Sequence, residues 1–188
     1  KMINVLMKNT SKEGGGGGDQ FWDDSTKALL AALCFYLVEC EDKSMQNFSE
    51  VMKLLKKAEV KEGSDDYQSD LDLIFDALEF PEKYMTEEAE HNEQFKNLNL
   101  IDLAKSAKPA SQYMCLKYYK DFKKAAGDTA KSILISTAVR LQAFNIPEVM
   151  DLTCCDNIHL EMIGDEKTVM YIIIPSSDDT FNFLAAMM

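Results

Sequence analysis

Hydrophobic residues recur at steps of three and four positions along most of the chain, which is the spacing of helices with one apolar face. This spacing predicts a helix that begins at Asp19, its N-cap, and ends near "ECEDKS", residues 39–44. It predicts a second helix after Ser44 and a third after Ser69, and Pro81 closes the third. The first half of the sequence is therefore typical of a series of capped amphipathic helices.

Two longer helices are predicted after Pro109. In residues 110–126 the apolar side chains share one arc of the helix and lysines occupy the opposite arc. Residues 128–144 are apolar over most of the circumference, so we expect them to form the central buried helix. Arg140, the only arginine, lies on the apolar arc of that helix, and its charge must therefore be paired.

The pattern changes beyond Pro147. Residues 169–174 form a β-rich run that is apolar on both faces, as in a strand of a parallel sheet covered on both sides. A single strand cannot fold alone, so this run and the helix start at 179–188 are expected to belong to an α/β neighbour. The predicted fold class is mainly α, a compact bundle of about six to eight helices with a short β element near the C-terminus.

Three segments are predicted from these changes in pattern. Residues 1–18 form a flanking helix and a glycine-rich hinge, 19–153 an all-α domain, and 154–188 the strand and helix start of the neighbouring domain. The five glycines before Asp19 do not fit a phosphate-binding loop, because Asp19 and Gln20 follow where lysine and a hydroxyl residue are needed. The chain starts at Lys1 and ends on an apolar run, which indicates an excised fragment.

The formal net charge of the 188 residues is −12, but the charges are unevenly distributed. Residues 59–93 carry thirteen acids against two lysines, and residues 105–140 carry eight bases against two acids. An acidic part and a basic part within one domain indicate charge-dependent partners more strongly than the net value does.

The five cysteines favour reduced thiols in the cytoplasm, because their number is odd and no Cys-x-x-Cys motif occurs. They do not fit a disulfide framework or a zinc site; the positions are Cys34, Cys40, Cys115, Cys154 and Cys155. The longest apolar run, residues 28–38, is about half of the ~20 residues that cross a bilayer. We therefore expect no membrane span and no direct membrane contact.

A basic stripe is the first candidate binding surface. Tyrosines interleave with its lysines and acids are nearly absent, a pattern that favours nucleic acid over an ordinary wet helix face. The predicted DNA-binding residues are Lys117, Lys120, Lys123, Lys124 and Lys131.

The acidic segment is the second candidate surface. Its alternatives are a solvated face without a partner and a binding face for a basic protein, with Asp65, Asp66 and Asp70 as the contact residues.

No catalytic residue, metal site or cofactor is predicted for this chain. Lys167 and Thr168 imitate a phosphate loop, but Gly164 is three residues before the lysine instead of adjacent. Asp178 and Asp179 follow an apolar run as magnesium-binding acids do, yet they are better explained as the cap of the last helix.

Three blocks of the sequence carry a family resemblance. They are "GGGGGDQFWDDSTKALLAALCFYL", "YYKDFKKAAGDTAKSILISTAVRLQAFNIPEVMDLT" and "IGDEKTVMYIIIPSSDDTFNFL". In this order they resemble the middle of a type IV coupling protein of the TraG/TraD type from a Gram-positive conjugative element. Residues 60–108 match only loosely.

The resemblance implies a larger parent protein. Members of the family are membrane-anchored hexameric motor ATPases, similar to the FtsK and RecA type, that pass a relaxase-bound DNA strand to the secretion channel. An all-α domain is inserted into their nucleotide-binding domain, and this chain resembles that insert. ATP, magnesium and the Walker motifs then belong to the parent. The insert is expected to be a cytoplasmic monomer that receives DNA, a relaxase or an accessory processing protein.

Overall fold

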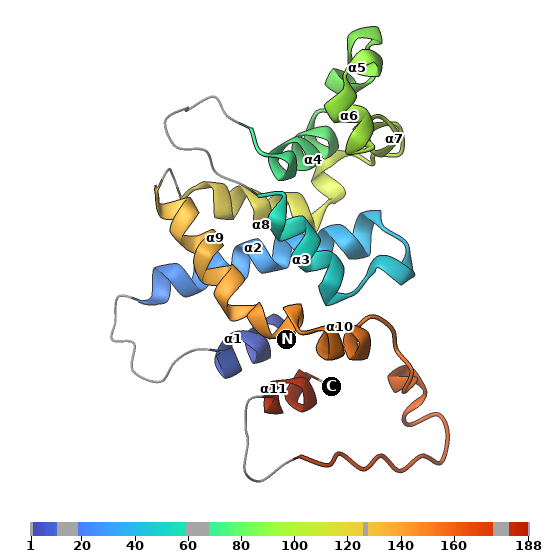
Figure 1. Ribbon diagram of the computed structural model, residues 1–188. Coiled ribbons are helices and arrows are strands. Elements are labelled where there is room, and N and C mark those ends of the chain that lie inside the picture. The colour runs from blue at the N-terminus through green and yellow to red at the C-terminus, as the bar shows by residue number, and fades with distance from the viewer. Residues whose placement is uncertain (1, 11–18, 59–67, 126–127, 175–180, 188) are drawn as a thin grey trace.

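The computed structural model describes residues 2–10, 19–58, 68–125, 128–174 and 181–187. Within these ranges the protein contains eleven α-helices and five short 3₁₀ helices (Figure 1). The α-helices are α1 (Met2–Thr10), α2 (Asp19–Cys40), α3 (Phe48–Lys56), α4 (Asp70–Glu79), α5 (Glu87–His91), α6 (Glu93–Asn97), α7 (Leu100–Lys105), α8 (Met114–Lys123), α9 (Asp128–Arg140), α10 (Pro147–Thr153) and α11 (Asn182–Met187). The 3₁₀ helices are η1 (Lys43–Met45), η2 (Pro81–Tyr84), η3 (Ala110–Gln112), η4 (Gln142–Asn145) and η5 (Leu160–Met162).

The predicted mainly α class is confirmed, and the helices are more numerous than the six to eight expected. The additional ones, such as α5, α6 and α7, are one or two turns long. Helices this short depend on tertiary contacts for their stability, and they leave little periodic signal in a sequence.

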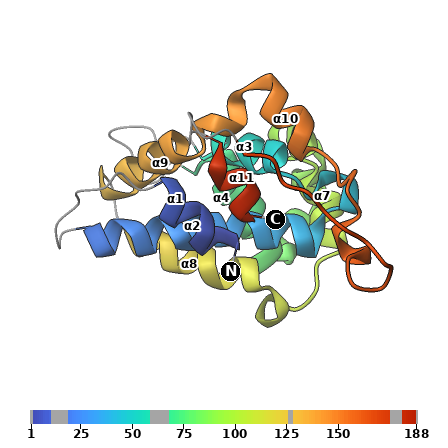
Figure 2. The ribbon, with the colours of Figure 1, turned by 90° about the horizontal axis from the view of Figure 1, so that it is seen from below.

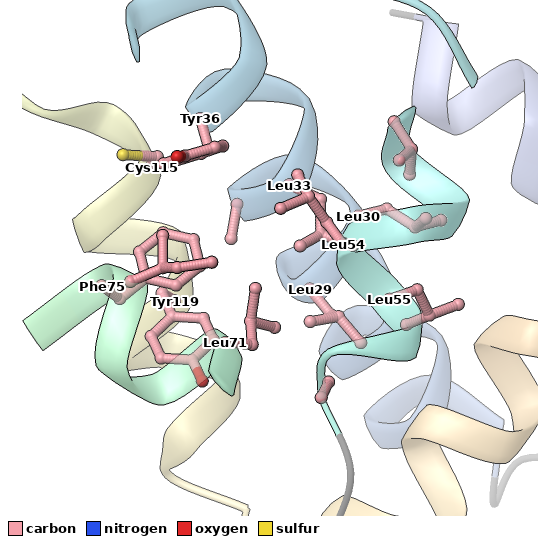
Figure 3. Packing of buried hydrophobic residues seen from close by; sticks show 14 of the residues in the cluster. Leu29, Leu30, Leu33, Tyr36, Leu54, Leu55, Leu71, Phe75, Cys115 and Tyr119 are labelled. Carbon is pink, nitrogen blue, oxygen red and sulfur yellow. The ribbon is translucent and has the colours of Figure 1, made fainter. Parts of the chain in front are cut away.

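Helix α2 is the centre of the molecule, and it ends at Cys40, within the stretch where its spacing predicts the end. It packs against α1, α3, α8 and α9. Leu29, Leu30 and Leu33 point from α2 toward α3, and Tyr36 lies on the side of α8 (Figure 3). Their burial joins the helices on both sides of α2 into one hydrophobic core.

Helix α4 joins this core through α8. Ser69 caps α4 in a reciprocal capping box with Asp72, as the serine in front of the apolar stripe predicts. Phe75 of α4 stacks on Tyr119 of α8 with ring centroids 3.9 Å apart. Two segments separated by more than thirty positions are thereby held together by an aromatic pair (Figure 3).

Helix α9 is not the central buried helix that its composition predicts. One side is buried, with Ile133 and Thr137 inaccessible to solvent, but Ile135 is 58% and Val139 62% exposed. The helix lies on the outside of α2 (Figure 1). The expected pairing of Arg140 is confirmed, because its Nη2 donates to Oδ1 of Asp23 in α2 at 2.6 Å.

The strand predicted at 169–174 is not formed. Residues 167–174 have no regular secondary structure, and Tyr171 and Ile173 are 85% and 93% exposed. Across the described ranges there is no strand, only an isolated bridge between Ile163 and Glu166. The β-branched residues favour an extended backbone, but a strand also needs a neighbour that pairs with its N–H and C=O groups.

The first and last helices lie side by side. Helix α1 contacts α11, and both are close together in the two views (Figure 2). Phe183 of α11 is buried against Phe144 of η4, with ring centroids 5.5 Å apart. The predicted hinge at 11–18 and the helix start at 179–180 fall outside the described residues.

Candidate substrate-binding surfaces

Helix α8, which carries the basic stripe, is fixed in position by α2. The two carboxylate oxygens of Glu39 accept hydrogen bonds from the backbone N–H groups of Met114 and Cys115, at 3.0 and 3.1 Å. These N–H groups have no partner within a helix, so a carboxylate supplied by another helix acts as the cap. The cap also occupies the positive end of α8, where an anion would otherwise be attracted.

Most of the predicted DNA-binding lysines on α8 are ion-paired. Lys120 Nζ lies 2.6 Å from Glu79 Oε1 and Lys123 Nζ lies 2.8 Å from Asp72 Oδ1, and both carboxylates come from α4. Lys124, the C-cap residue of α8, pairs with Asp121 of that helix at 2.6 Å. The three lysine side chains remain 51–76% exposed, but a carboxylate next to each already offsets part of its charge.

The other two predicted lysines differ from these three. Lys117 is exposed and forms no ion pair with a residue in the described ranges. Lys131 lies on α9, is half-buried and interacts with neighbouring groups. The structure therefore places three of the five lysines on α8, Lys124 at its C-cap and Lys131 on another helix.

The tyrosines that favoured nucleic acid stabilise the fold. Tyr119 is buried and its hydroxyl donates to Asp72 Oδ1 at 2.7 Å. The hydroxyl of the buried Tyr113 accepts from the backbone N–H of Lys108 at 2.8 Å. Tyr118 stacks on Phe35 of α2, with ring centroids 5.5 Å apart and planes 7° from parallel. Two of the three rings are buried and one face of the third is covered, so they do not form an open stacking surface.

Asp72 connects α4 to α8. Its carboxylate accepts from the hydroxyl of Ser69 at 2.7 Å, from the backbone N–H of Ser69 at 3.0 Å and from Tyr119, and it pairs with Lys123. Burial alone would raise the pKa of Asp72, but the hydrogen bonds from Lys123, Ser69 and Tyr119 outweigh it and leave the pKa below its ordinary value. Lys123, predicted to contact DNA, is therefore part of this interhelical network.

The acids predicted to bind a partner are only partly described. Asp65 and Asp66 fall outside the described residues. Asp70 is half-buried at the start of α4, and its Oδ1 accepts from Nε2 of Gln94 at 2.7 Å. That bond ties α4 to α6.

A different group of acids forms a second charged surface on the part of the chain that the structure describes. We call it the acidic tip: five exposed glutamates on η2, α5 and α6, namely Glu82, Glu87, Glu88, Glu90 and Glu93. Helices α5 and α6 project from one end of the molecule, above α4 (Figure 1). None of the five glutamates forms an ion pair with a residue that the structure describes.

The acidic tip is held on the helical body by a few contacts. The hydroxyl of Tyr84 donates to Asp76 of α4 at 2.9 Å, and its buried ring packs on Phe95 of α6, with centroids 4.9 Å apart. Thr86 caps α5 and Asn92 caps α6. The glutamates are therefore displayed on ordered backbone, although each helix is short.

The acidic tip was missed as a separate site because its residues merged with a longer acidic segment in the sequence. A signal was present: Thr86 is followed by three glutamates within five positions, which marks an acidic first turn of a helix. Only the position of α5 at the end of the molecule distinguishes these acids from those that pair with α8.

A family model provides the relationship to known proteins. The model of type IV secretory system conjugative DNA transfer proteins matches residues 1–187. The chain belongs to this family. Searches of curated proteins and of solved structures returned no significant match.

Two further findings concern this conjugative transfer protein. Among the residues that the structure describes, no helix is long and apolar enough to cross a membrane. Over the same residues, no group of three or more His, Cys, Asp or Glu side chains is placed to hold a metal ion.

Proposed function

We propose that this chain is the substrate-receiving domain of a conjugative coupling protein, and that it binds a relaxase or accessory processing protein through the acidic tip. The partner chemistry follows from the surface, since five exposed glutamates are complementary to a basic protein segment. The observation that carries the proposal is the display of these unpaired glutamates on a part of the molecule that projects from the helical body (Figure 1).

The ion pairs of the lysines on α8 support a protein partner over DNA. A lysine that binds phosphate must first give up its present ion pair, so part of the gain from releasing counterions is lost. This applies to Lys120, Lys123 and Lys124, and leaves Lys117 as the exposed lysine on α8 without a described ion partner. Contact between DNA and α8 is the second candidate function, and the same experiment tests it.

The parent protein in this proposal is a hexameric motor ATPase on the cytoplasmic side of the plasma membrane. Its ATP and magnesium bind outside this chain, and the helical domain is an insert in its nucleotide-binding domain. Helices α1 and α11 flank the insert on its two sides, and their contact supports the insertion because the chain must enter and leave an inserted domain at neighbouring points. The exposed apolar run at 169–174 supports the assignment of residues 154–188 to the neighbouring domain, where a sheet would pair with it.

A charge-neutralised variant tests the acidic tip. The triple substitution Glu87→Gln, Glu88→Gln and Glu90→Gln keeps helix-forming side chains on α5 and removes three charges. Binding of the relaxase encoded on the same element is measured by titration calorimetry at two salt concentrations. Three exposed charge pairs at about 0.5 kcal/mol each would weaken binding by roughly tenfold.

The control removes three exposed acids elsewhere. Asp42→Asn, just before η1, and Glu148→Gln and Asp151→Asn on α10 change the net charge by the same amount, and relaxase affinity should stay within about twofold. Equal weakening by both triple variants would mean that only net charge matters. Tight oligonucleotide binding with no relaxase binding would replace the proposal with the DNA candidate.

A further inference from the structure

Two cysteines form a contact at the end of α10. Cys154 follows the last residue of the helix, Cys155 comes next, and both are exposed. Their Sγ atoms are 3.5 Å apart, within the contact distance of two thiols. Cys154 Sγ also lies 3.1 Å from the carbonyl oxygen of Asp151, and Cys155 Sγ lies 3.6 Å from Oδ1 of Asn157.

The other thiols are less accessible. Cys115 is fully buried, and hydrogen bonding with Cys40 and burial raise its pKa. Burial raises the pKa of the Cys34 thiol to about 11. Because the thiolate is the reactive form, such thiols are inert near neutral pH. The pair at 154–155 is the one place in the described chain where two exposed thiols touch.

We propose that Cys154 and Cys155 form a reversible dithiol site, which low-molecular-weight disulfides oxidise to a disulfide between the two adjacent residues. Because the sulfur atoms are already 3.5 Å apart, closing the bond requires an adjustment of the two side chains and of the peptide that joins them, without movement of a helix. The site is independent of the acidic tip and of the proposed partner.

The reaction balances as two thiol–disulfide exchanges. The S–H of Cys154 donates to Cys155 Sγ, which stabilises a thiolate on Cys155, so Cys155 is assigned as the first nucleophile. Its thiolate attacks one sulfur of the external disulfide, forms a mixed disulfide and releases one thiolate. Cys154 then loses its proton to water, attacks the Cys155 sulfur and displaces the second thiolate. Two cysteine thiols are oxidised and one external disulfide is reduced to two thiols.

The product should be easily reduced. Adjacent Cα atoms are about 3.8 Å apart across a trans peptide, whereas ordinary disulfides join Cα atoms roughly 4.4–6.8 Å apart. The ring that contains the bond is therefore strained, and strained exposed disulfides are the labile ones. This favours a switchable site over a structural cross-link.

The site lies where α10 ends and the non-helical segment 155–159 begins. Asp156 orders that segment, because its carboxylate accepts from the backbone N–H groups of Ile158, His159 and Leu160 at 2.9, 2.9 and 3.2 Å. Ring closure at 154–155 fixes the peptide between α10 and this turn. Oxidation should therefore change the local backbone and leave the core of α2, α4 and α8 unaffected.

The test uses the whole chain and oxidised glutathione as the probe. After incubation, intact-mass spectrometry should show a product that has lost two hydrogen atoms, and peptide mapping should place the bond between Cys154 and Cys155. Dithiothreitol should reverse it. Cys154→Ser and Cys155→Ser should each give a glutathione adduct instead, whereas the control Cys34→Ala should oxidise like the unmodified chain.

A second readout tests the contact in the reduced protein. Phenylarsine oxide condenses with two neighbouring thiols, forms two As–S bonds and releases one water molecule. One equivalent should bind, and either serine variant should lose this binding. The proposal is wrong if the unmodified chain accumulates only glutathione adducts or intermolecular dimers, or if the bond maps to Cys40 and Cys115.

Discussion

Replacement of Asp72 by alanine should destabilise the protein more than any single lysine substitution on α8. The carboxylate of Asp72 accepts from Tyr119 at 2.7 Å, from Ser69 at 2.7 and 3.0 Å, and pairs with Lys123 at 2.8 Å. It therefore serves both as the second half of a helix cap and as the link between α4 and α8. Asp72→Ala removes both functions at once.

The magnitude follows from the groups that lose their partner. The buried hydroxyl of Tyr119 would be left without an acceptor, at a cost of about 1–3 kcal/mol. The weakened cap of α4 adds about 1 kcal/mol. Lys123 is half-exposed and returns to water, so its pair contributes less than ~1 kcal/mol. The total of about 3 kcal/mol corresponds to a fall in melting temperature of roughly 10 °C for a domain of this size.

Urea denaturation followed by circular dichroism measures this loss. Tyr119→Phe keeps the ring stacked on Phe75 and removes only the hydroxyl, so it should cost about 1 kcal/mol. In the double variant the orphaned hydroxyl is absent, and the two losses should be less than additive by about 1 kcal/mol or more. Additive losses, or a cost below about 0.5 kcal/mol for Asp72→Ala, would refute the role given to Asp72.

The same carboxylate predicts a pH dependence. Its folded-state pKa lies below the ordinary value of 3.8, so the folded state releases the proton more readily than the unfolded chain does. The stabilisation is fully present above pH 3.8 and is lost as the pH falls through the lower, folded-state pKa. The difference in unfolding free energy between the unmodified chain and Asp72→Ala should therefore be constant from pH 5 to 7 and shrink below about pH 4.

Three further outcomes are expected. Glu39→Ala should cost about 1 kcal/mol in urea denaturation because α8 loses its cap, whereas the exposed Asp42→Ala should be neutral. If α8 contacts DNA, Lys117→Gln should flatten the log–log salt slope of oligonucleotide binding by about 0.9. Lys120→Gln should change that slope less, because Lys120 is already ion-paired. Anisotropy titrations at several salt concentrations compare the two variants. The 188-residue chain should sediment as a monomer and hydrolyse no ATP, and phosphate release that Lys167→Ala abolishes would contradict this.

The longer helices could be predicted because their signals are local. The end of α2 and the cap and end of α4 follow from Ser69, Pro81 and the spacing of apolar residues. Helices α5 and α6 could not be placed in this way. Each is five residues long, and the packing of Tyr84 on Phe95 that orders them joins residues eleven positions apart.

The errors at α9 and at 169–174 have one physical cause. An apolar side chain shows that a position favours burial, but it does not identify what covers it. Ile135 and Val139 have no covering element in the described chain, and neither do Tyr171 and Ile173. The apolar composition of both segments indicated positions that favour burial. It could not show whether another part of the protein covers them, because that depends on the neighbouring elements.

The basic stripe shows the same limit for charge. A count of lysines on α8 treats the helix as if it were alone, whereas α4 places Asp72 and Glu79 opposite Lys123 and Lys120. The acidic and basic segments therefore neutralise each other in part where these two helices meet, and the formal charge of each overstates what a partner encounters. The acidic tip lies beyond that contact, and no lysine in the described chain pairs with it. The glutamates of the acidic tip are therefore open to a basic partner, without competition from the lysines of α8. For this reason we propose that recognition takes place at the acidic tip.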